Sequence, residues 1–325
     1  MEFDVSLADI EAARARVAGQ VRATPTWRSE ALSRRLDAEV FLKLECLQLG
    51  GSFKMRGVLN KLATMDEAAR ARGIVTVSGG NHAIATAEAA RATGTRALVT
   101  MPSVTPAYNV ERTRAAGAEV ELCESAAIAF ARAQELGRAG MTFVHPYDDP
   151  AVIAGHGTLG LELAEAVPGM TDVFVSIGGG GFMSGVAAAV KGRLPAARMH
   201  GVETQGAETM TRALAAGRPE TIAPSSIART LGAPFATERT MAAARRFLEG
   251  IEVVPDAEAV AELDALVADE HVWCEPAASC TVAAALRLRA RLGARPRIVL
   301  VLCGSNVAFD DVARWRVQFG LAAAG

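Results

Sequence analysis

Short apolar runs alternate with longer alanine-rich runs over most of this 325-residue chain. The apolar runs are rich in β-branched residues and have the length of strands, whereas the stretches between them have the length of helices. Strands that are apolar on both faces and alternate with helices are typical of a mostly parallel sheet covered by helices. The candidate strands are residues 40–44, 74–77, 97–100, 119–122, 173–177, 199–202 and 297–302. The sequence therefore predicts an α/β protein with a twisted, mostly parallel sheet.

No internal repeat, low-complexity tract or flexible linker interrupts the chain, so a second domain has to be inserted into the first rather than joined to its end. The stretch from residue 74 to about residue 148 is a natural insertion, because its pattern is that of a compact βαβαβ unit. It ends in the turn-rich segment 145–150. We expect a smaller α/β unit inside a larger one.

Composition and charge exclude several classes of function. Half of the residues are apolar and the formal net charge is −2, so the chain can bury a large core and has no basic stripe for nucleic acid. No basic amphipathic segment favours a membrane surface, so small molecules are the expected partners. Residues 1–17 are patterned like an amphipathic helix, without a signal-peptide core or a spanning segment. These features predict a cytoplasmic protein.

The cysteines and histidines do not form a metal or disulfide pattern. The five cysteines contain no C-x-x-C pair, and their odd number argues against a disulfide framework, so we expect free thiols. The five histidines show no H-E-x-x-H spacing or cluster. A zinc ion held by the protein is therefore not expected.

One lysine, Lys54, stands where an apolar strand is expected to end and a helix to begin. Gly50 and Gly51 form the turn, and Ser52 is the predicted N-cap of a helix starting near Phe53. The positive end of the helix dipole and partial burial would both lower the pKa of the Lys54 amine, which makes it able to form a Schiff base. A solvated lysine after a loop explains this segment alone equally well. Three further loops favour the chemical interpretation, because ligands gather at the carboxyl ends of parallel strands.

The first of these loops is Ser78-Gly79-Gly80-Asn81-His82, which leads into an alanine-rich helix expected from residue 83. Backbone amide groups at the helix start, with the Ser78 hydroxyl and the Asn81 amide, suit a carboxylate or a phenolic oxygen. An ordinary strand-to-helix turn remains an equal alternative on this segment alone.

The second loop is Gly178-Gly179-Gly180-Gly181, expected to precede a helix that starts at about residue 183. Four successive glycines allow backbone amides to point into one concavity, which a phosphate dianion needs.

A dinucleotide site is the rival interpretation of this loop, since Glu203 follows about 20 residues later, where a ribose-binding acid is found. The spacing does not match, because Met183 or Ser184 stands where G-x-G-x-x-G requires its last glycine.

The third loop is Cys303-Gly304-Ser305-Asn306, after the last candidate strand. A thiol at a strand end is most often a small buried hydrophobic group. Next to a heterocyclic nitrogen it could act as a weak hydrogen-bond donor.

Taken together, these segments closely resemble the fold-type II enzymes that depend on pyridoxal 5′-phosphate (PLP), in particular the serine/threonine dehydratase and serine racemase family. The resemblance extends over residues 10–315. The segments that carry it are Gly-Ser-Phe-Lys-Met-Arg-Gly at 51–57, Ser-Gly-Gly-Asn-His at 78–82, His-Pro at 145–146, Pro-Ala-Val-Ile-Ala-Gly-His-Gly-Thr at 150–158, the four glycines and Cys-Gly-Ser-Asn at 303–306.

The resemblance implies a role for each motif. Lys54 holds PLP covalently, Phe53 packs against its ring, Asn81 binds its phenolic oxygen and Cys303 faces its pyridine nitrogen. The phosphate is bound by Gly178, Gly179, Gly180 and Gly181. The substrate carboxylate is received by Ser78, Gly79, Gly80, Asn81 and His82. By the same resemblance, a small substrate-closing domain of residues 68–149 lies within a large PLP-binding domain of residues 1–67 and 150–325, and a homodimer is expected.

Two departures from the family pattern favour elimination over racemisation. Racemisation uses a serine at the position of Gly79 as a second acid/base, and glycine carries no proton to give. Cys303 replaces the usual serine, and a neutral thiol with a reference pKa of about 8.5 does not keep a pyridine nitrogen protonated as a carboxylate does. Prompt loss of a β-substituent is then favoured over transamination or racemisation. A thiolate at Cys303 would weaken this argument.

The family's cation site is incomplete in this chain. Its glutamate, backbone carbonyl and aspartate align with Glu203, Ala207 and Thr209, so the second carboxylate is missing. The missing carboxylate argues against a bound divalent cation, and a more weakly held cation, divalent or monovalent, stays open. Solvation at the surface is a comparable explanation for Glu203.

The resemblance implies a PLP-dependent lyase that converts a β-hydroxy-L-amino acid, by default L-threonine or L-serine, to a 2-oxo acid and ammonia. Phenylserine and hydroxyaspartate are alternative substrates, and Tyr147, Phe130 and Arg229 border that side of the pocket by approximate alignment. The chain length leaves no room for an appended regulatory domain, so isoleucine feedback is not expected. Serine racemase, a nicotinamide-dependent oxidoreductase and a non-catalytic amino-acid-binding protein remain the other candidates.

Overall fold

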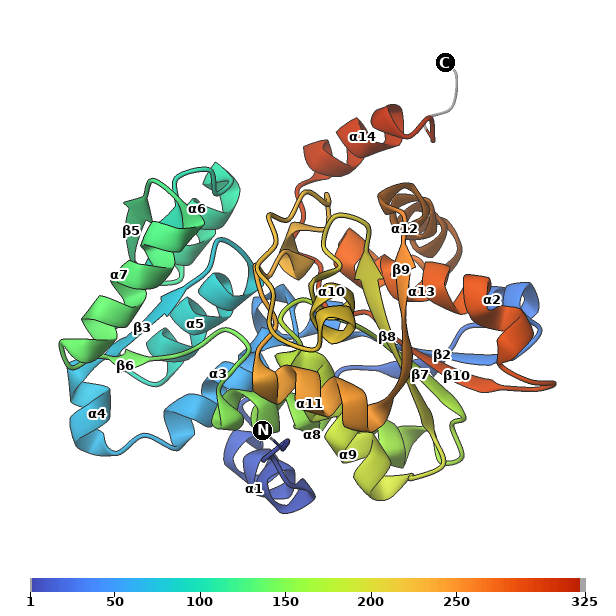
Figure 1. Cartoon of the computed structure of the whole chain (residues 1–325), viewed down its shortest axis with the longest axis horizontal. Coiled ribbons are helices and arrows are strands. Elements are labelled where there is room, and N and C mark those ends of the chain that lie inside the picture. Colours follow the sequence, from blue (N-terminus) through green and yellow to red (C-terminus); the bar gives the residue numbers. More distant parts are fainter. Residues whose placement is uncertain (1, 322–325) are drawn as a thin grey trace.

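The computed structural model describes residues 2–321 and contains two separate β-sheets (Figure 1). The larger sheet has six strands, and all neighbouring pairs are parallel except the antiparallel pair at one edge. Its strands, in spatial order, are β1 (Thr26–Arg28), β2 (Glu39–Lys43), β10 (Arg297–Val301), β7 (Asp172–Ser176), β8 (Arg198–Thr204) and β9 (Leu248–Val254). Because β2, β10 and β7 are parallel neighbours, the loops that follow them meet at one edge of the sheet.

The smaller sheet has four parallel strands, and its chain segment lies within the sequence that forms the larger sheet. In spatial order they are β5 (Glu119–Cys123), β4 (Ala97–Pro102), β3 (Ile74–Val77) and β6 (Thr142–Phe143). Figure 1 shows this sheet to one side of the larger sheet, with β3 leading toward the middle of the molecule. The predicted α/β fold class is confirmed. The domain limits at residues 68 and 149 stay a prediction.

Helices cover both sheets. They are α1 (Leu7–Val17), α2 (Glu30–Leu36), α3 (Lys54–Ala63), α4 (Glu67–Arg72), α5 (Asn81–Ala92), α6 (Ala107–Ala115), α7 (Ala126–Arg138), α8 (Pro150–Ala166), α9 (Gly181–Arg193), α10 (Thr209–Ala216), α11 (Glu238–Phe247), α12 (Asp256–Glu270), α13 (Pro276–Leu288) and α14 (Phe309–Gln318). Helix α13 packs on β7, β8, β9 and β10, while α5 and α7 pack on β3 and β4. Helix α3 contacts both α5 and α8, so it joins the two units.

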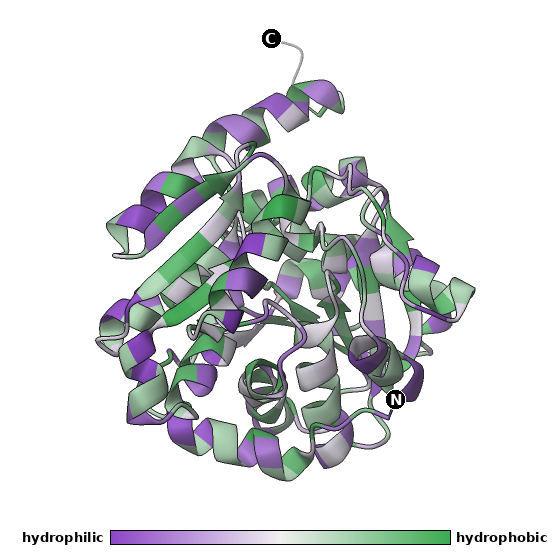
Figure 2. Cartoon of the chain, turned by 60° about the vertical axis from the view of Figure 1, so that its left-hand side comes forward, coloured by the Kyte–Doolittle hydropathy of each residue, from purple (hydrophilic) through white to green (hydrophobic). Residues whose placement is uncertain are grey.

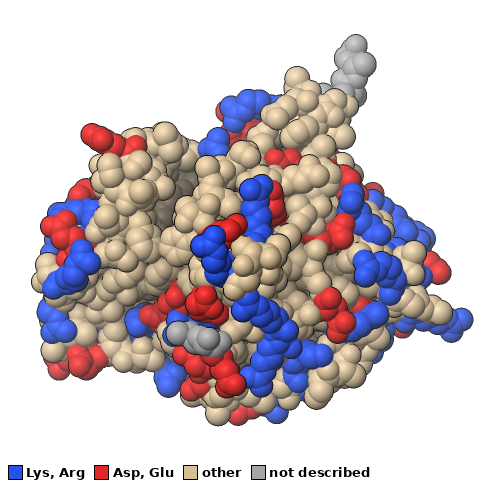
Figure 3. All heavy atoms as spheres, in the orientation of Figure 1, with Lys and Arg blue, Asp and Glu red and all other residues tan. Residues whose placement is uncertain are grey.

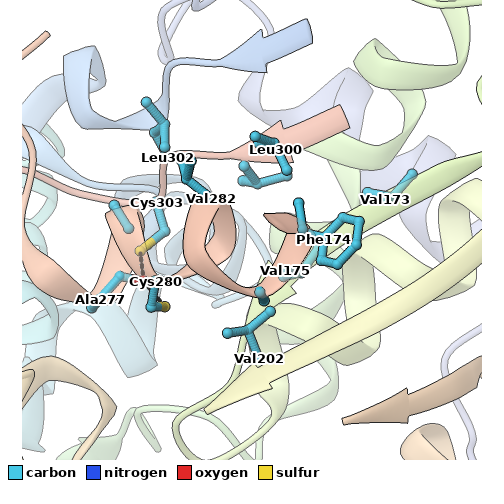
Figure 4. Packing of buried hydrophobic residues seen from close by; sticks show 14 of the residues in the cluster. Val173, Phe174, Val175, Val202, Ala277, Cys280, Val282, Leu300, Leu302 and Cys303 are labelled. Carbon is cyan, nitrogen blue, oxygen red and sulfur yellow. Dashed lines mark hydrogen bonds between the residues drawn. The ribbon is translucent and has the colours of Figure 1, made fainter. Parts of the chain in front are cut away.

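The largest apolar core lies between the large sheet and its helices. Strand β7 is buried at every position, and ten consecutive residues of α13 from its first position are buried. Figure 2 shows the central strands as hydrophobic and most outer helices as mixed, as expected for helices with one buried face. Figure 4 shows Phe174, Val202 and Leu300 from three neighbouring strands packed near Cys303. Cys303 therefore lies where this core meets the edge loops.

The seven predicted strands are all present, with ends that differ by no more than a few residues. The sequence missed β1, β6 and β9, and all three lie at a sheet edge. An edge strand needs no continuous apolar run, since one side faces solvent, and β9 carries exposed residues within it. Helices α5 and α9 begin two residues earlier than expected.

Two further expectations concern the whole chain. All five cysteines are free and buried, as the sequence predicted. Among residues 2–321, no helix has the length and apolarity needed to cross a lipid bilayer.

Candidate functional site

Lys54 opens helix α3 directly after the loops that leave β2. The Lys54 side chain is partly buried, and its Nζ donates a hydrogen bond to the Pro146 carbonyl oxygen at 2.6 Å. Burial lowers the pKa of this amine from 10.5 to about 8, while the thiol of Cys303 opposes the change. The sequence predicted the lowered pKa from burial and from the helix start, and burial is its main cause. A larger fraction of the Lys54 amine is therefore unprotonated near neutral pH than in a solvated lysine.

The predicted cap of α3 is wrong. Phe53, not Ser52, is the residue that precedes the helix, and it makes no side-chain cap. Ser52 has an extended backbone and pairs with Gly304, and its buried hydroxyl has no partner among the described residues. The segment is held instead by backbone bonds to the loop after β10, including Phe53 N–H to the Cys303 carbonyl at 3.1 Å. Pairing with a distant loop therefore replaces the local cap and fixes Lys54 beside Cys303.

Aromatic rings surround the start of α3. The Phe53 ring stacks on Phe182 with centroids 3.7 Å apart and meets His156 edge-on at 4.9 Å. The nitrogens of His156 and Nδ1 of His82 are buried without a partner in the described chain. Burial, followed by the charge of Lys54, lowers the pKa of both imidazoles well below the ordinary value. Both rings are therefore neutral near pH 7.

The four glycines, Gly178 to Gly181, follow β7 and lead into α9. Gly180 has φ +94, a conformation that favours glycine. A Cβ at Gly179 would overlap the Tyr147 ring, and a Cβ at Gly181 would overlap the Tyr147 carbonyl. No side chain caps helix α9, so the first backbone N–H groups of the helix have no side-chain hydrogen-bond acceptor in the loop. The tight packing restricts these positions to glycine. The uncapped backbone N–H groups suit a phosphate group.

The loop after β3 has a different construction. Gly80 N–H donates to the Ser78 hydroxyl at 3.2 Å, and Asn81 begins α5. The Gly79 carbonyl accepts from the Asn109 amide at 2.8 Å. A Cβ at Gly79 would lie 2.6 Å from the Thr105 hydroxyl, so the position that a longer residue would occupy is taken by that hydroxyl. Ser78, Gly79 and Gly80 are each partly exposed.

Asn81 lies in a hydrogen-bond network that the sequence did not reveal. Its Nδ2 donates to a carboxylate oxygen of Glu275 at 2.7 Å, and its Oδ1 accepts from Asn306 at 2.7 Å. These two contacts fix which side of the amide carries the N–H groups. The Thr230 hydroxyl also donates to Glu275, at 3.2 Å. Arg112 on α6 donates to Asn306 and so connects the small unit to this network.

Glu275 is the main site residue that sequence reasoning missed. Its carboxyl is fully buried, and burial raises its pKa to about 7, although the bonds from Asn81 and Thr230 oppose the rise. A glutamate between the apolar segment 272–274 and Pro276 was the available signal, since such a residue is seldom buried without a partner. It reads equally well as an acidic residue at the start of a helix.

Cys303 is buried within the site. Its Sγ lies 3.4 Å from both the Ser176 hydroxyl and the Ala277 carbonyl oxygen, and Figure 4 marks the latter contact. Burial, reinforced by Glu275, raises the pKa of the thiol well above its ordinary value. The group is therefore a neutral thiol, and the thiolate alternative is disfavoured.

The residues aligned with a cation site have other partners. The Glu203 carboxylate accepts from the Met210 N–H at 2.7 Å and from the backbone and hydroxyl of Thr211 at 3.0 and 2.6 Å, which caps α10. Burial raises its pKa to about 7. Ala207 is buried, and the Thr209 hydroxyl donates to the Ala233 carbonyl at 2.7 Å. No group of three or more His, Cys, Asp or Glu suited to a metal occurs within residues 2–321.

The remaining pocket residues divide into two kinds. Tyr147 and Phe130 lie in one aromatic cluster near Lys54, whereas Arg229 is exposed. The structure thus gathers Lys54, Asn81, the four glycines and Cys303 around one site. Its buried amine, its glycine-lined turn and its neutral thiol fit the aldehyde, phosphate and ring nitrogen of PLP.

Comparisons with known proteins agree with this chemistry. Residues 17–304 match the model of a family described as pyridoxal-phosphate dependent enzyme. The chain is 34% identical to an L-threonine ammonia-lyase of Thermotoga maritima, over 95% of this chain and 78% of the relative. It is 36% identical to a phenylserine dehydratase of Ralstonia pickettii, over 97% and 96% of the two chains.

A solved structure of maize serine racemase superposes with a TM-score of 0.88 at 31% identity and covers 98% of both chains. The family model and these relatives each span nearly all of the large and small units. The predicted family is therefore confirmed, and the chain belongs to the pyridoxal-phosphate dependent enzymes, in the family of threonine/serine dehydratases and serine racemases.

Proposed function

We propose that this protein is a PLP-dependent ammonia-lyase that converts a β-hydroxy-L-amino acid to a 2-oxo acid and ammonia. The observation that carries the proposal is the partly buried Lys54 amine, with a pKa of about 8 and one hydrogen bond, to Pro146, within the described chain. PLP supplies an aldehyde for covalent attachment and a ring that stabilises negative charge at the substrate α-carbon. L-Threonine and L-serine are the expected substrates by family membership.

Lys54 has two tasks in this proposal. With PLP bound, its Nζ would hold the cofactor covalently, and the amine freed by substrate binding would accept the α-proton of the substrate. With a pKa of about 8, about a tenth of the Lys54 amine is unprotonated at pH 7, against less than about a thousandth for a solvated lysine. The β-hydroxyl would leave with one proton as water, and hydrolysis of the released enamine would give the 2-oxo acid and ammonia.

The other site residues bind and orient. The Gly178 to Gly181 turn would hold the phosphate, and the second N–H of Asn81 would bind the phenolic oxygen while Glu275 holds the first. The neutral Cys303 thiol would lie near the ring nitrogen and leave it unprotonated, which favours prompt β-elimination. The Ser78 to His82 loop would receive the substrate carboxylate. Glu203 and Ala207 would contribute to a cation site only if Glu203 released the start of α10.

The setting of the enzyme is also a proposal. We expect a homodimer in the cytoplasm, as is typical of the family. Light scattering of the purified protein tests the first expectation, and a mass of one chain would contradict it. Fractionation of the source cells tests the second.

Turnover of L-threonine and L-serine by the PLP-loaded protein tests the proposed function. We expect stoichiometric 2-oxo acid and ammonia, and Lys54→Ala should abolish turnover while the protein remains folded. Visible absorbance that is unchanged in Lys54→Ala, or turnover that survives it, would refute the role of Lys54. A panel without any ammonia release would favour a non-catalytic amino-acid-binding protein.

A further inference from the structure

Five aromatic side chains form a continuous cluster beside the site, which we call the aromatic wall. Neighbouring rings in it have centroids 4.6 to 6.0 Å apart, and all the pairs meet edge to face. The aromatic wall consists of Phe130, Phe143, His145, Tyr147 and Phe235. Phe130 comes from α7 of the small unit and Phe235 from the segment between α10 and α11, so the two units both contribute.

The aromatic wall adjoins the site through the segment from His145 to Tyr147. The carbonyl of Pro146, between His145 and Tyr147 in sequence, accepts the hydrogen bond from Lys54 at 2.6 Å. The Tyr147 ring packs against Gly179 so closely that a Cβ there would overlap it. Tyr147 is therefore the ring of the aromatic wall that meets the four-glycine turn, and the rings of His145 and Phe235 pack against it.

The exposure of the rings shows that the aromatic wall is not simply a sealed core. Phe130, Phe143, His145 and Phe235 are each partly exposed, whereas Tyr147 is buried. The Tyr147 hydroxyl is buried and has no hydrogen-bond partner among the described residues. Partly open rings that converge on a reactive lysine are typical of a ligand surface rather than of a closed core.

The aromatic wall carries no charge. Burial lowers the pKa of His145 to about 4, so its imidazole is neutral near pH 7. Arg239, which is close to it, is occupied by ion pairs with Asp148 and Asp4. Figure 3 shows a hollow between the small unit and the large unit whose visible atoms are mostly uncharged. A substrate carboxylate at this place would lose its hydration without gaining a free cation.

Resting on the proposed function, we propose that the aromatic wall selects the substituent on the β-carbon of the substrate. The preferred substrate class is then a β-hydroxy amino acid with an aryl group on that carbon, of the phenylserine type. An aryl ring gains edge-to-face contacts and buries apolar area against Phe130 and Phe235. The methyl group of threonine and the hydrogen of serine are too small to cover the same surface, so most of it stays exposed to solvent.

The test compares four substrates with the PLP-loaded enzyme: L-threo-phenylserine, L-threonine, L-serine and L-threo-3-hydroxyaspartate. We expect kcat/KM for phenylserine to exceed that for threonine by about 10-fold or more, the scale on which an apolar pocket discriminates. Turnover of threonine or hydroxyaspartate in preference to phenylserine would overturn the inference and leave the proposed function intact. No turnover of any of the four would overturn both.

Variants of Phe130 assign the preference to the aromatic wall. Phe130→Ala should lower kcat/KM for phenylserine by about 10-fold and change that for threonine less than about 3-fold. Ile128→Ala, an exposed position on the same helix, is the matched control and should change neither. Phe130→Leu and Phe235→Leu keep apolar volume and serve if the alanine variant does not fold. Equal losses with both substrates in a folded variant would show a merely structural role.

A binding measurement removes turnover from the comparison. In PLP-loaded Lys54→Ala, a spectral titration should give a lower Kd for phenylserine than for threonine, and adding Phe130→Ala should erase the difference. A Kd ratio near one in Lys54→Ala would contradict the inference whatever the rates are.

Discussion

Two glycine loops, one in each unit, lie at the site and differ in how tightly the surrounding structure holds them. The turn from Gly178 to Gly181 leaves no room for a Cβ at its last three positions: at Gly180 it would lie 2.7 Å from Met210 and Thr240, and at Gly181 it would overlap backbone. In the loop after β3, a Cβ at Gly79 would lie 2.6 Å from the side-chain hydroxyl of Thr105, whereas at Gly80 it would meet only the Thr230 methyl at 3.5 Å, which is ordinary contact. The first loop, here called the closed loop, is buried at three of four positions, whereas the second, the open loop, is partly exposed at Ser78, Gly79 and Gly80.

This difference corresponds to two tasks. A cofactor that stays bound favours a cradle fixed by packing from all sides, because preorganised N–H groups need no rearrangement. A substrate that enters and leaves in each turnover favours a loop with spare room. The network from Asn81 to Glu275 joins the two, since Asn81 ends the open loop and Glu275 belongs to the large unit.

The largest expected change in the free energy of unfolding follows a substitution in the closed loop. Gly181→Ala should destabilise the protein by about 3 kcal/mol or more, because the new Cβ overlaps the Tyr147 carbonyl and neither backbone has room to move. Urea unfolding of the cofactor-free protein measures the free energy of unfolding. A loss below about 1 kcal/mol would show that the closed loop is as adaptable as the open one.

The second prediction concerns the carboxyl that joins the loops. Burial raises the pKa of Glu275 from 4.5 to about 7, so folding favours its protonated form. The free energy of unfolding of the native sequence should therefore fall relative to that of Glu275→Gln as the pH rises from 4.5 through 7. The full shift corresponds to a change of about 3 kcal/mol, at about 1.4 kcal/mol per unit. Urea unfolding of both cofactor-free proteins at pH 5 and pH 8 measures this gap, and a gap that does not change with pH would contradict the assignment.

The smallest expected change in the free energy of unfolding follows a substitution in the open loop. Gly80→Ala should change the free energy of unfolding by less than about 1 kcal/mol, because the added methyl group makes only ordinary contacts. The same urea unfolding, run beside Gly181→Ala, provides the comparison. Equal destabilisation by the two substitutions would remove the distinction between the loops.

The sequence predicted the parts of the site that depend on local pattern. Lys54, Asn81, the four glycines and Cys303 each follow a buried strand, and parallel pairing brings those strand ends together. Ser52 was assigned wrongly, because a helix cap is a local pattern while its actual pairing is with Gly304, far away in the chain. Edge strands were missed for a related reason, since exposure removes the apolar run.

Long-range geometry limits what the sequence can reveal about the rest. Glu275 acquires its role from Asn81, almost 200 residues earlier, and nothing in its own segment distinguishes it from an acidic residue at a helix start. The aromatic wall joins α7 to the segment after α10, so no single stretch of sequence contains it. Buried charge and pocket lining both depend on which distant elements pack together.

Attachment of the cofactor to Lys54 is the claim on which the proposed chemistry depends, and one measurement addresses it directly. The purified protein is loaded with PLP, reduced with borohydride to fix any imine bond, digested and sequenced by mass spectrometry. We predict a pyridoxyl group on the peptide that contains Lys54 and none on those that contain Lys43 or Lys61. A pyridoxyl group on another lysine, or an unmodified Lys54 in protein that has taken up PLP, would contradict the account.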